Sequence, residues 1–179
     1  MQYRRLKIEG SSYFFTLVTD KRKKLFADDE NVALLRQAFR HVMKKRVFVI
    51  EAIVILPDHI HCIWTLPAGD ADFSTRWRLI KTWFTKHCDE QYKSAPNKAR
   101  IKKQQQAVWQ HRYWEHGIKD EVDFEHHVNY IHYNPVKHGY VERAVDWQYS
   151  SIHKYIKRGI VSDGWGAGNI SIPDGIGCE

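Results

Sequence analysis

The sequence feature that most constrains the fold is a long, largely apolar segment interrupted by two turn-forming residues. Residues 47–56 (VFVIEAIVIL) are rich in β-branched side chains, and Pro57 and Asp58 separate them from a second apolar run at 59–66. β-branched and aromatic residues favour strands, whereas a Pro-Asp pair favours a turn. The segment therefore predicts two antiparallel strands joined by a tight hairpin, the first of them central in its sheet.

The flanking segments predict the remaining elements. We expect strands at 13–19 and within 108–118, a helix capped by Asp28, a helix over 73–91, a helix from Asp120 to about Asn134 that Pro135 and Gly139 bring to an end, and a short helix near 150–157. This order is typical of an α+β protein with a ferredoxin-like antiparallel sheet of four to five strands backed by helices. We expect one catalytic domain over residues 1–158, with a basic, mobile insertion at about 93–106, and a Gly-rich tail over 159–179.

Composition narrows the class of protein. The chain has 43% hydrophobic and 27% charged residues, as globular proteins do, and its net charge is +7. Such an excess of positive charge favours a polyanionic partner, although it is also compatible with a solvated surface. The N-terminus has no apolar run typical of a signal peptide, and no segment is long enough to span a membrane, so we expect a cytoplasmic protein. Three cysteines without a CxxC pair predict no disulfide framework.

A His-x-His pair opens the second strand of the hairpin. Residues two apart on a strand point to the same face, so His59 and His61 present two imidazoles side by side. Such a pair suits a divalent metal ion. The alternative is two polar residues at a strand start that backbone or solvent satisfies.

A tyrosine and an asparagine share one face of the predicted last long helix. Tyr130 and Asn134 lie one turn apart, so a hydroxyl and an amide oxygen could approach one centre together. Asn134 could complete a metal site begun by the two histidines and leave positions for a phosphate oxygen. The alternative is a buried aromatic ring and a polar residue at a helix end.

Several blocks in the same order resemble one family. They are residues 3–5 (YRR), 13–16 (YFFT), 56–67 (LPDHIHCIWTLP), 73–77 (FSTRW), 112–116 (RYWEH), 130–139 (YIHYNPVKHG), 146–151 (DWQYSS) and Trp165 with Gly166. With these blocks the chain resembles the REP-associated tyrosine transposases of the single-tyrosine HUH superfamily.

The resemblance implies a mechanism. His59, His61 and Asn134 would bind Mg²⁺ or Mn²⁺, and Tyr130, on its helix, would attack the scissile phosphate of single-stranded DNA. The products would be a 5′-phosphotyrosine link and a free 3′-hydroxyl. Reversal of the same step would rejoin strands, so the activity implied is metal-dependent nicking and strand transfer.

The resemblance also implies the substrate and its partners. We expect single-stranded DNA that folds into a hairpin, like the repetitive extragenic palindromes of the family. The candidate contacts to it are cationic: Arg4, Arg5, Arg76, Arg78, Lys81 and Lys137. By resemblance the protein acts as a monomer, although related transposases are dimers and a dimer remains possible.

Two other functions stay open at this point. One is a catalytically silent regulator that binds single-stranded nucleic acid, which would tolerate Tyr130→Phe. The other is a metal-dependent hydrolase that uses His59 and His61 without a covalent step. We expect His126, His127 and His132 to be surface or packing residues, and Cys62 to point to the strand face opposite the histidines.

Overall fold

The structure is a computed structural model that describes residues 9–93, 107–168, 170, 173 and 175–177. The predicted insertion at 93–106, except for its first residue, and Arg4 and Arg5 lie outside these ranges. The strands are β1 (Ser12–Val18), β2 (Val49–Ile55), β3 (His59–Thr65) and β4 (Trp114–Gly117). The α-helices are α1 (Asp29–Met43), α2 (Phe73–His87), α4 (Glu121–Lys137) and α5 (Ile152–Lys157).

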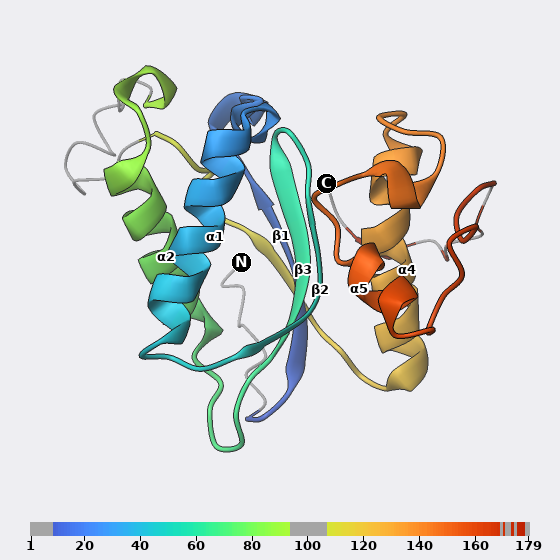
Figure 1. Ribbon diagram of the computed structural model, residues 1–179. Coiled ribbons are helices and arrows are strands. Elements are labelled where there is room, and N and C mark those ends of the chain that lie inside the picture. The colour runs from blue at the N-terminus through green and yellow to red at the C-terminus, as the bar shows by residue number, and fades with distance from the viewer. Residues whose placement is uncertain (1–8, 94–106, 169, 171–172, 174, 178–179) are drawn as a thin grey trace.

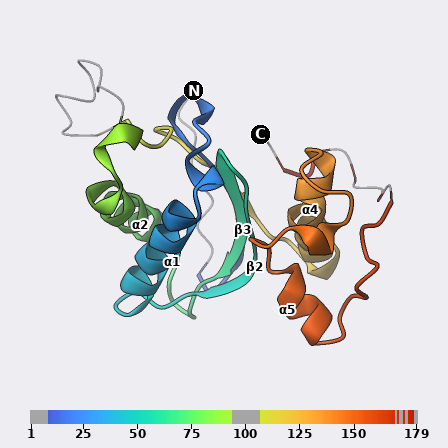
Figure 2. The ribbon, with the colours of Figure 1, turned by 45° about the horizontal axis from the view of Figure 1, so that its top comes forward.

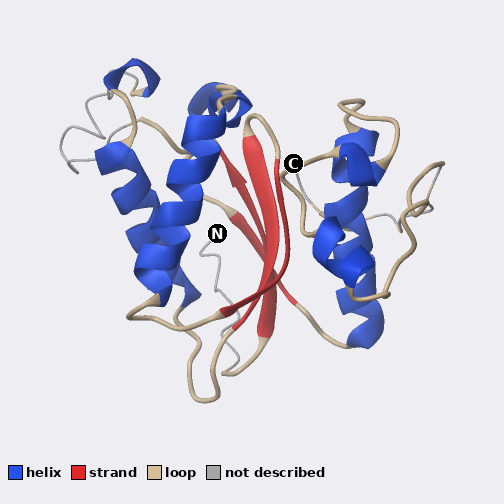
Figure 3. Cartoon of the chain, in the orientation of Figure 1, coloured by secondary structure: helices blue, strands red, loops and turns tan. Residues whose placement is uncertain are grey.

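The four strands form one antiparallel sheet in the order β2-β3-β1-β4. Figure 3 shows this sheet as a single layer between helices. The predicted hairpin is present, because β2 and β3 pair directly across Pro57 and Asp58. The order of elements and the strand order are those of a ferredoxin-like sheet, so the predicted fold class is confirmed.

Helices α1 and α2 cover one face of the sheet, as the views in Figures 1 and 2 agree. The strand residues that point toward them are apolar and mostly aromatic, including Tyr13, Phe15 and Trp64. Trp64 stacks on Trp77 of α2 with ring centroids 4.0 Å apart. Because these side chains carry little polarity, burial of apolar surface accounts for the packing on this face.

Helix α4 covers the other face, and α5 lies beside it (Figure 1). The core here is smaller and includes Phe14, Ile63, Val128 and Ile131. The segment before α5 also closes the edge of β2, where Ser151 N–H donates to the Ile53 carbonyl at 2.8 Å. Unpaired backbone groups at the edge of a sheet can pair with another chain and cause aggregation, and this hydrogen bond satisfies one such group of β2.

Two helix ends differ from the prediction. Helix α4 continues through Pro135 to Lys137, because His138 N–H still donates to the Asn134 carbonyl at 3.0 Å and closes the last turn. Pro135 removes only its own N–H from the helix, and Gly139, the second residue predicted to end it, follows the helix at a φ of 69°. Helix α2 ends at His87 rather than at residue 91, because the chain is extended at Cys88.

Helix starts agree with the prediction. The Asp28 side chain accepts from Glu30 N–H at the start of α1, and the Asp120 side chain accepts from Asp123 N–H at the start of α4. Each bond satisfies an N–H that the first helical turn leaves without a partner. Asp120 in this way defines where the helix that carries Tyr130 begins.

Candidate active site

Strand β3 places the two predicted histidines on the face that α4 covers. Ile60, Cys62 and Trp64 alternate toward α1 and α2, so His59 and His61 point the other way. Both rings are buried, at 1% and 0% exposure, and their centroids lie 4.9 Å apart. The prediction that Cys62 lies on the opposite face is confirmed, since its side chain belongs to the α1 and α2 core.

Both histidines are held at Nδ1. His59 Nδ1 lies 2.6 Å from the Asp58 carboxylate, and His61 Nδ1 lies 2.9 Å from the Thr16 hydroxyl. In the tautomer that donates these bonds from Nδ1, Nε2 carries the lone pair that a metal ion requires. Asp58 and Thr16 therefore orient the two rings and favour the tautomer suited to metal binding.

Asp58 is the residue that our reasoning from the sequence missed. Burial raises the pKa of this carboxyl, but hydrogen bonds and charges from His59 and Arg22 outweigh it, so the pKa is lowered. Its carboxylate accepts from Arg22 at 3.1 Å as well as facing His59. An ionised Asp58 keeps the proton of His59 on Nδ1 and raises the basicity of Nε2.

Helix α4 brings three polar side chains over the histidines. Tyr130, Asn134 and His138 follow one another at intervals of four residues, which places them along one face. The Tyr130 ring lies 5.1 Å from the His61 ring, and the His138 ring lies 5.2 Å from the His59 ring. Asn134, which is fully buried, lies between them on that face.

The same spacing could have identified His138 from the sequence. His138 stands eight residues after Tyr130, but it was passed over because Pro135 was expected to end the helix earlier. The structure shows that the helical turn includes Pro135, so His138 caps the end of α4 at the site. A prediction that allowed a proline in the last turn would have found it.

Lys137 contacts the hydroxyl of Tyr130. Its Nζ donates to the phenolic oxygen at 3.3 Å and lies 4.9 Å from the centre of the ring. An ammonium group at this position stabilises negative charge on the phenolic oxygen. The residue was predicted as a DNA contact, and the structure places it beside the predicted nucleophile.

The C-terminal tail covers Tyr130. A β-carbon added at Gly177 would lie 2.3 Å from Cε1 and Cζ of the tyrosine ring, so only glycine fits there. Ile176 packs on the same core, and Tyr130 is 2% exposed. The tail residues 176 and 177 thus lie directly on the predicted nucleophile.

Three of the other predicted cationic residues, Arg76, Arg78 and Lys81, lie away from Tyr130 on α2. Arg76 is buried, and its guanidinium donates to both carboxylate oxygens of Asp70, at 3.1 and 2.7 Å, and to the Val47 carbonyl at 2.8 Å. These bonds hold the guanidinium inside the fold. Arg78 and Lys81 lie on α2, on the face of the sheet opposite Tyr130 (Figure 1).

The other histidines of α4 differ in burial. His127 and His132 are buried, whereas His126 is partly exposed. Burial lowers the pKa of His132 to about 3, and its Nε2 lies 2.9 Å from the Ser151 hydroxyl. Tyr140 lies beyond Gly139 and outside α4.

The donor set at the histidines fits a divalent cation. The nitrogen donors are the two imidazoles, whose Nδ1 atoms are bonded to a carboxylate and a hydroxyl. The oxygen donor is the buried amide of Asn134 on the facing helix. Imidazole nitrogen and amide oxygen are both donors that divalent metal ions accept.

No helix in the described part of the chain is long and apolar enough to cross a bilayer.

Comparison with known families agrees with this geometry. The model of the IS200-like transposases matches residues 7–134, which is more than half of the chain, so the protein belongs to this family. A REP-associated tyrosine transposase of Escherichia coli is 42% identical over 171 residues, which cover 95% of this chain and 93% of that protein. A relative from Haemophilus influenzae that is named for the same group is 42% identical over 164 residues, or 92% of each chain.

A solved structure extends the comparison to three dimensions. It is a REP-associated tyrosine transposase bound to a REP hairpin, and it matches with a TM-score of 0.77 and 38% identity over 99% of both chains. The predicted resemblance to the REP-associated tyrosine transposases is thereby confirmed, and the chain is an enzyme of the transposase class.

Proposed function

We propose that this transposase nicks single-stranded DNA at hairpin-forming repeats and transfers the strand through a 5′-phosphotyrosine at Tyr130. The observation that carries the proposal is the contact between the Tyr130 and His61 rings, 5.1 Å apart within one chain. Nucleophile and metal ligands are thus assembled without a second subunit, which favours a monomer as the active form.

His59, His61 and Asn134 would hold the cation, Mg²⁺ or Mn²⁺, with Asp58 and Thr16 orienting the two rings. When bound, it would polarise the scissile phosphate and offset the charge that develops during displacement.

Tyr130 performs the displacement. Its oxygen forms the new bond to phosphorus while the bond from phosphorus to the 3′-oxygen breaks, and the departing oxygen takes up a proton as a 3′-hydroxyl. Lys137, 3.3 Å from the phenolic oxygen, stabilises the phenolate after the phenol proton leaves. Because the phosphodiester energy is conserved in the tyrosine link, a 3′-hydroxyl can reverse the step and rejoin DNA.

The substrate class follows from the relative of known structure, which is bound to a REP hairpin. The net charge of +7 provides the electrostatic attraction that a DNA ligand needs. Of the predicted cationic contacts, Arg4, Arg5, Arg78, Lys81 and Lys137 stay predictions for this DNA.

Access to Tyr130 requires the tail to move. With Ile176 and Gly177 packed on the ring, a phosphate cannot reach the phenolic oxygen. The tail that begins at residue 159 would therefore restrict the nuclease.

The test is a covalent adduct assay. The purified full chain is mixed with end-labelled hairpin oligonucleotides and Mn²⁺ or Mg²⁺, and the products are separated on a denaturing gel. We expect a metal-dependent adduct that Tyr130→Phe reduces on the order of 1000-fold or more. His59→Ala should remove it too, whereas Tyr133→Phe, a matched control on the same helix, should retain it.

Other outcomes would replace the proposal. Cleavage with many turnovers and no adduct would indicate the hydrolase. Tight hairpin binding by every variant, without any cleavage, would indicate the silent regulator. An adduct that survives Tyr130→Phe would move the nucleophile to another residue.

A further inference from the structure

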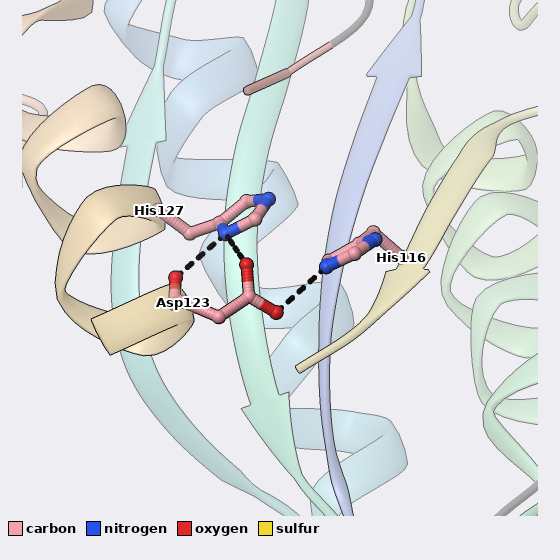
Figure 4. Close-up of side chains that lie close together, drawn as sticks. All are labelled: His116, Asp123 and His127. Atoms are coloured by element: carbon pink, nitrogen blue, oxygen red, sulfur yellow. Dashed lines mark hydrogen bonds and ion pairs between the residues drawn. The ribbon is translucent and has the colours of Figure 1, made fainter. Parts of the chain in front are cut away.

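A second group of metal-binding side chains lies on the same face of the sheet, at the start of α4. Figure 4 shows Asp123 between the rings of His116 and His127. His116 Nε2 lies 2.8 Å from Asp123 Oδ2, and His127 Nδ1 lies 3.1 Å from Asp123 Oδ1. One ligand atom from each of the three residues lies within 4.8 Å of the other two.

The group links strand β4 to helix α4. His116 lies on β4, the edge strand, while Asp123 and His127 lie one turn apart at the start of α4. Asp123 also accepts from Lys119 N–H at 2.9 Å, and this bond holds its carboxylate in position between the two rings.

The protonation states suit metal binding. Burial raises the pKa of Asp123, but hydrogen bonds from His116 and Lys119 N–H outweigh this, so the pKa is lowered. Burial lowers the pKa of His127. A metal ion binds the ionised form of a carboxylate and the neutral form of an imidazole, with a lone pair on the ligating nitrogen.

We propose that His116, Asp123 and His127 bind a divalent transition-metal ion, of which Zn²⁺ fits the ligand set best, and that the ion fastens α4 to β4. Zn²⁺ holds such ligands at about 2.0–2.2 Å, so neighbouring ligand atoms stand roughly 3.3 Å apart. The separations of 2.8 and 3.1 Å would widen by a few tenths of an ångström, and His127 Nδ1 would release the Asp123 carbonyl, to which it donates at 2.7 Å. His127 is 2% exposed at its side chain and His116 24%, which leaves an open side for a water ligand.

The location connects this site to the active site. His127 lies three residues before Tyr130 on α4, and the Phe14 ring packs against both, at 4.8 and 5.9 Å between centroids. An ion here would hold the first turns of the helix that carries the nucleophile. The proposal does not depend on the chemistry at Tyr130, because it concerns different ligands.

The test is Zn²⁺ titration of the full chain, free of affinity tags, by calorimetry, with Co²⁺ absorption as a report on tetrahedral coordination. Wild type is compared with Asp123→Asn, with His59→Ala/His61→Ala and with His126→Gln, a control histidine on the same helix. We expect Asp123→Asn to weaken one binding event at least 10-fold or to abolish it. The double histidine variant and His126→Gln should retain this event and its tetrahedral Co²⁺ spectrum.

Thermal unfolding with and without a chelator separates a metal site from a purely hydrogen-bonded cluster. Zn²⁺ should raise the Tm of wild type and not that of Asp123→Asn. If Asp123→Asn does not fold, His116→Gln on the exposed edge strand is the second variant, with the same expectation. Equal Zn²⁺ binding by wild type and both cluster variants would overturn the proposal. Loss of binding only in His59→Ala/His61→Ala would overturn it as well and leave the proposed active site standing.

Discussion

The two faces of the central sheet are packed by different physical means. Toward α1 and α2, rings such as Trp64 and Trp77 stack 4.0 Å apart in an almost wholly apolar core. Toward α4, the buried set contains His59, His61, His127, His132 and Asn134. Burying polar groups costs free energy unless they are hydrogen-bonded, so the second face carries a larger cost of this kind than the first, where Arg76 and Asn31 are buried.

This difference assigns a role to each face. The apolar face provides the stability that a marginally stable domain requires. The polar face is tolerated because its groups are held by partners such as Asp58, Thr16 and Ser151. Functional sites often violate local packing rules, and the rest of the molecule offsets the loss of stability.

The largest effect is expected from breaking the apolar face. Trp77→Ala should lower the free energy of unfolding by about 3–5 kcal/mol, because it leaves a cavity under Trp64. Arg78→Ala, its exposed neighbour on α2, should change it by less than about 0.5 kcal/mol. Denaturant unfolding measures both, and equal losses would show that the face is not the main source of stability.

The next effect concerns the polar face at acidic pH. The pKa of His132 is lowered to about 3 in the folded protein, so below about pH 6.5 the unfolded state binds the proton more readily. Stability contributed by the neutral ring is thus present above pH 6.5 and is lost as the pH falls. Between pH 7 and pH 5 the loss should be about 2 kcal/mol.

Denaturant unfolding of wild type and His132→Gln at both pH values measures this contribution. The variant should lose correspondingly less stability on acidification, and His41→Gln, at an exposed position on α1, should behave as wild type. An identical pH dependence in wild type and His132→Gln would contradict the assignment.

A smaller effect is expected at Lys137. Lys137→Met should slow adduct formation at saturating DNA about 10-fold, because the phenolate loses the ammonium at 3.3 Å. Lys137→Arg should restore part of the rate, and Lys157→Met on α5 should leave it unchanged. A loss of DNA affinity without a change in the saturated rate would make Lys137 a phosphate contact only.

The smallest effect is expected from the tail. A chain that ends at residue 172 should form the adduct a few-fold faster, since removing a contact of about 1 kcal/mol or less uncovers Tyr130. Single-turnover adduct formation measures this change. An unchanged rate would show that Ile176 and Gly177 do not restrict access to Tyr130.

The sequence predicted much of the fold and part of the site. Apolar runs rich in β-branched residues on either side of Pro57 and Asp58 identified the hairpin, and the capping residues Asp28 and Asp120 located two helix starts. The end of α4 was wrong by one turn because tertiary packing of Pro135 outweighs its local preference. His138 was missed for that reason, and Asp58 because nothing in the sequence marks a turn carboxylate as the partner of the next histidine.

By itself the sequence determined the element order, the shared face of His59 and His61, and the shared face of Tyr130 and Asn134. These follow from strand and helix periodicity, which acts over a few residues. Only the tertiary structure decided that α4 lies over β3, that Lys137 contacts the Tyr130 hydroxyl, and that Gly177 covers it. Such contacts join residues far apart in the chain, and they depend on how whole layers pack rather than on any local pattern.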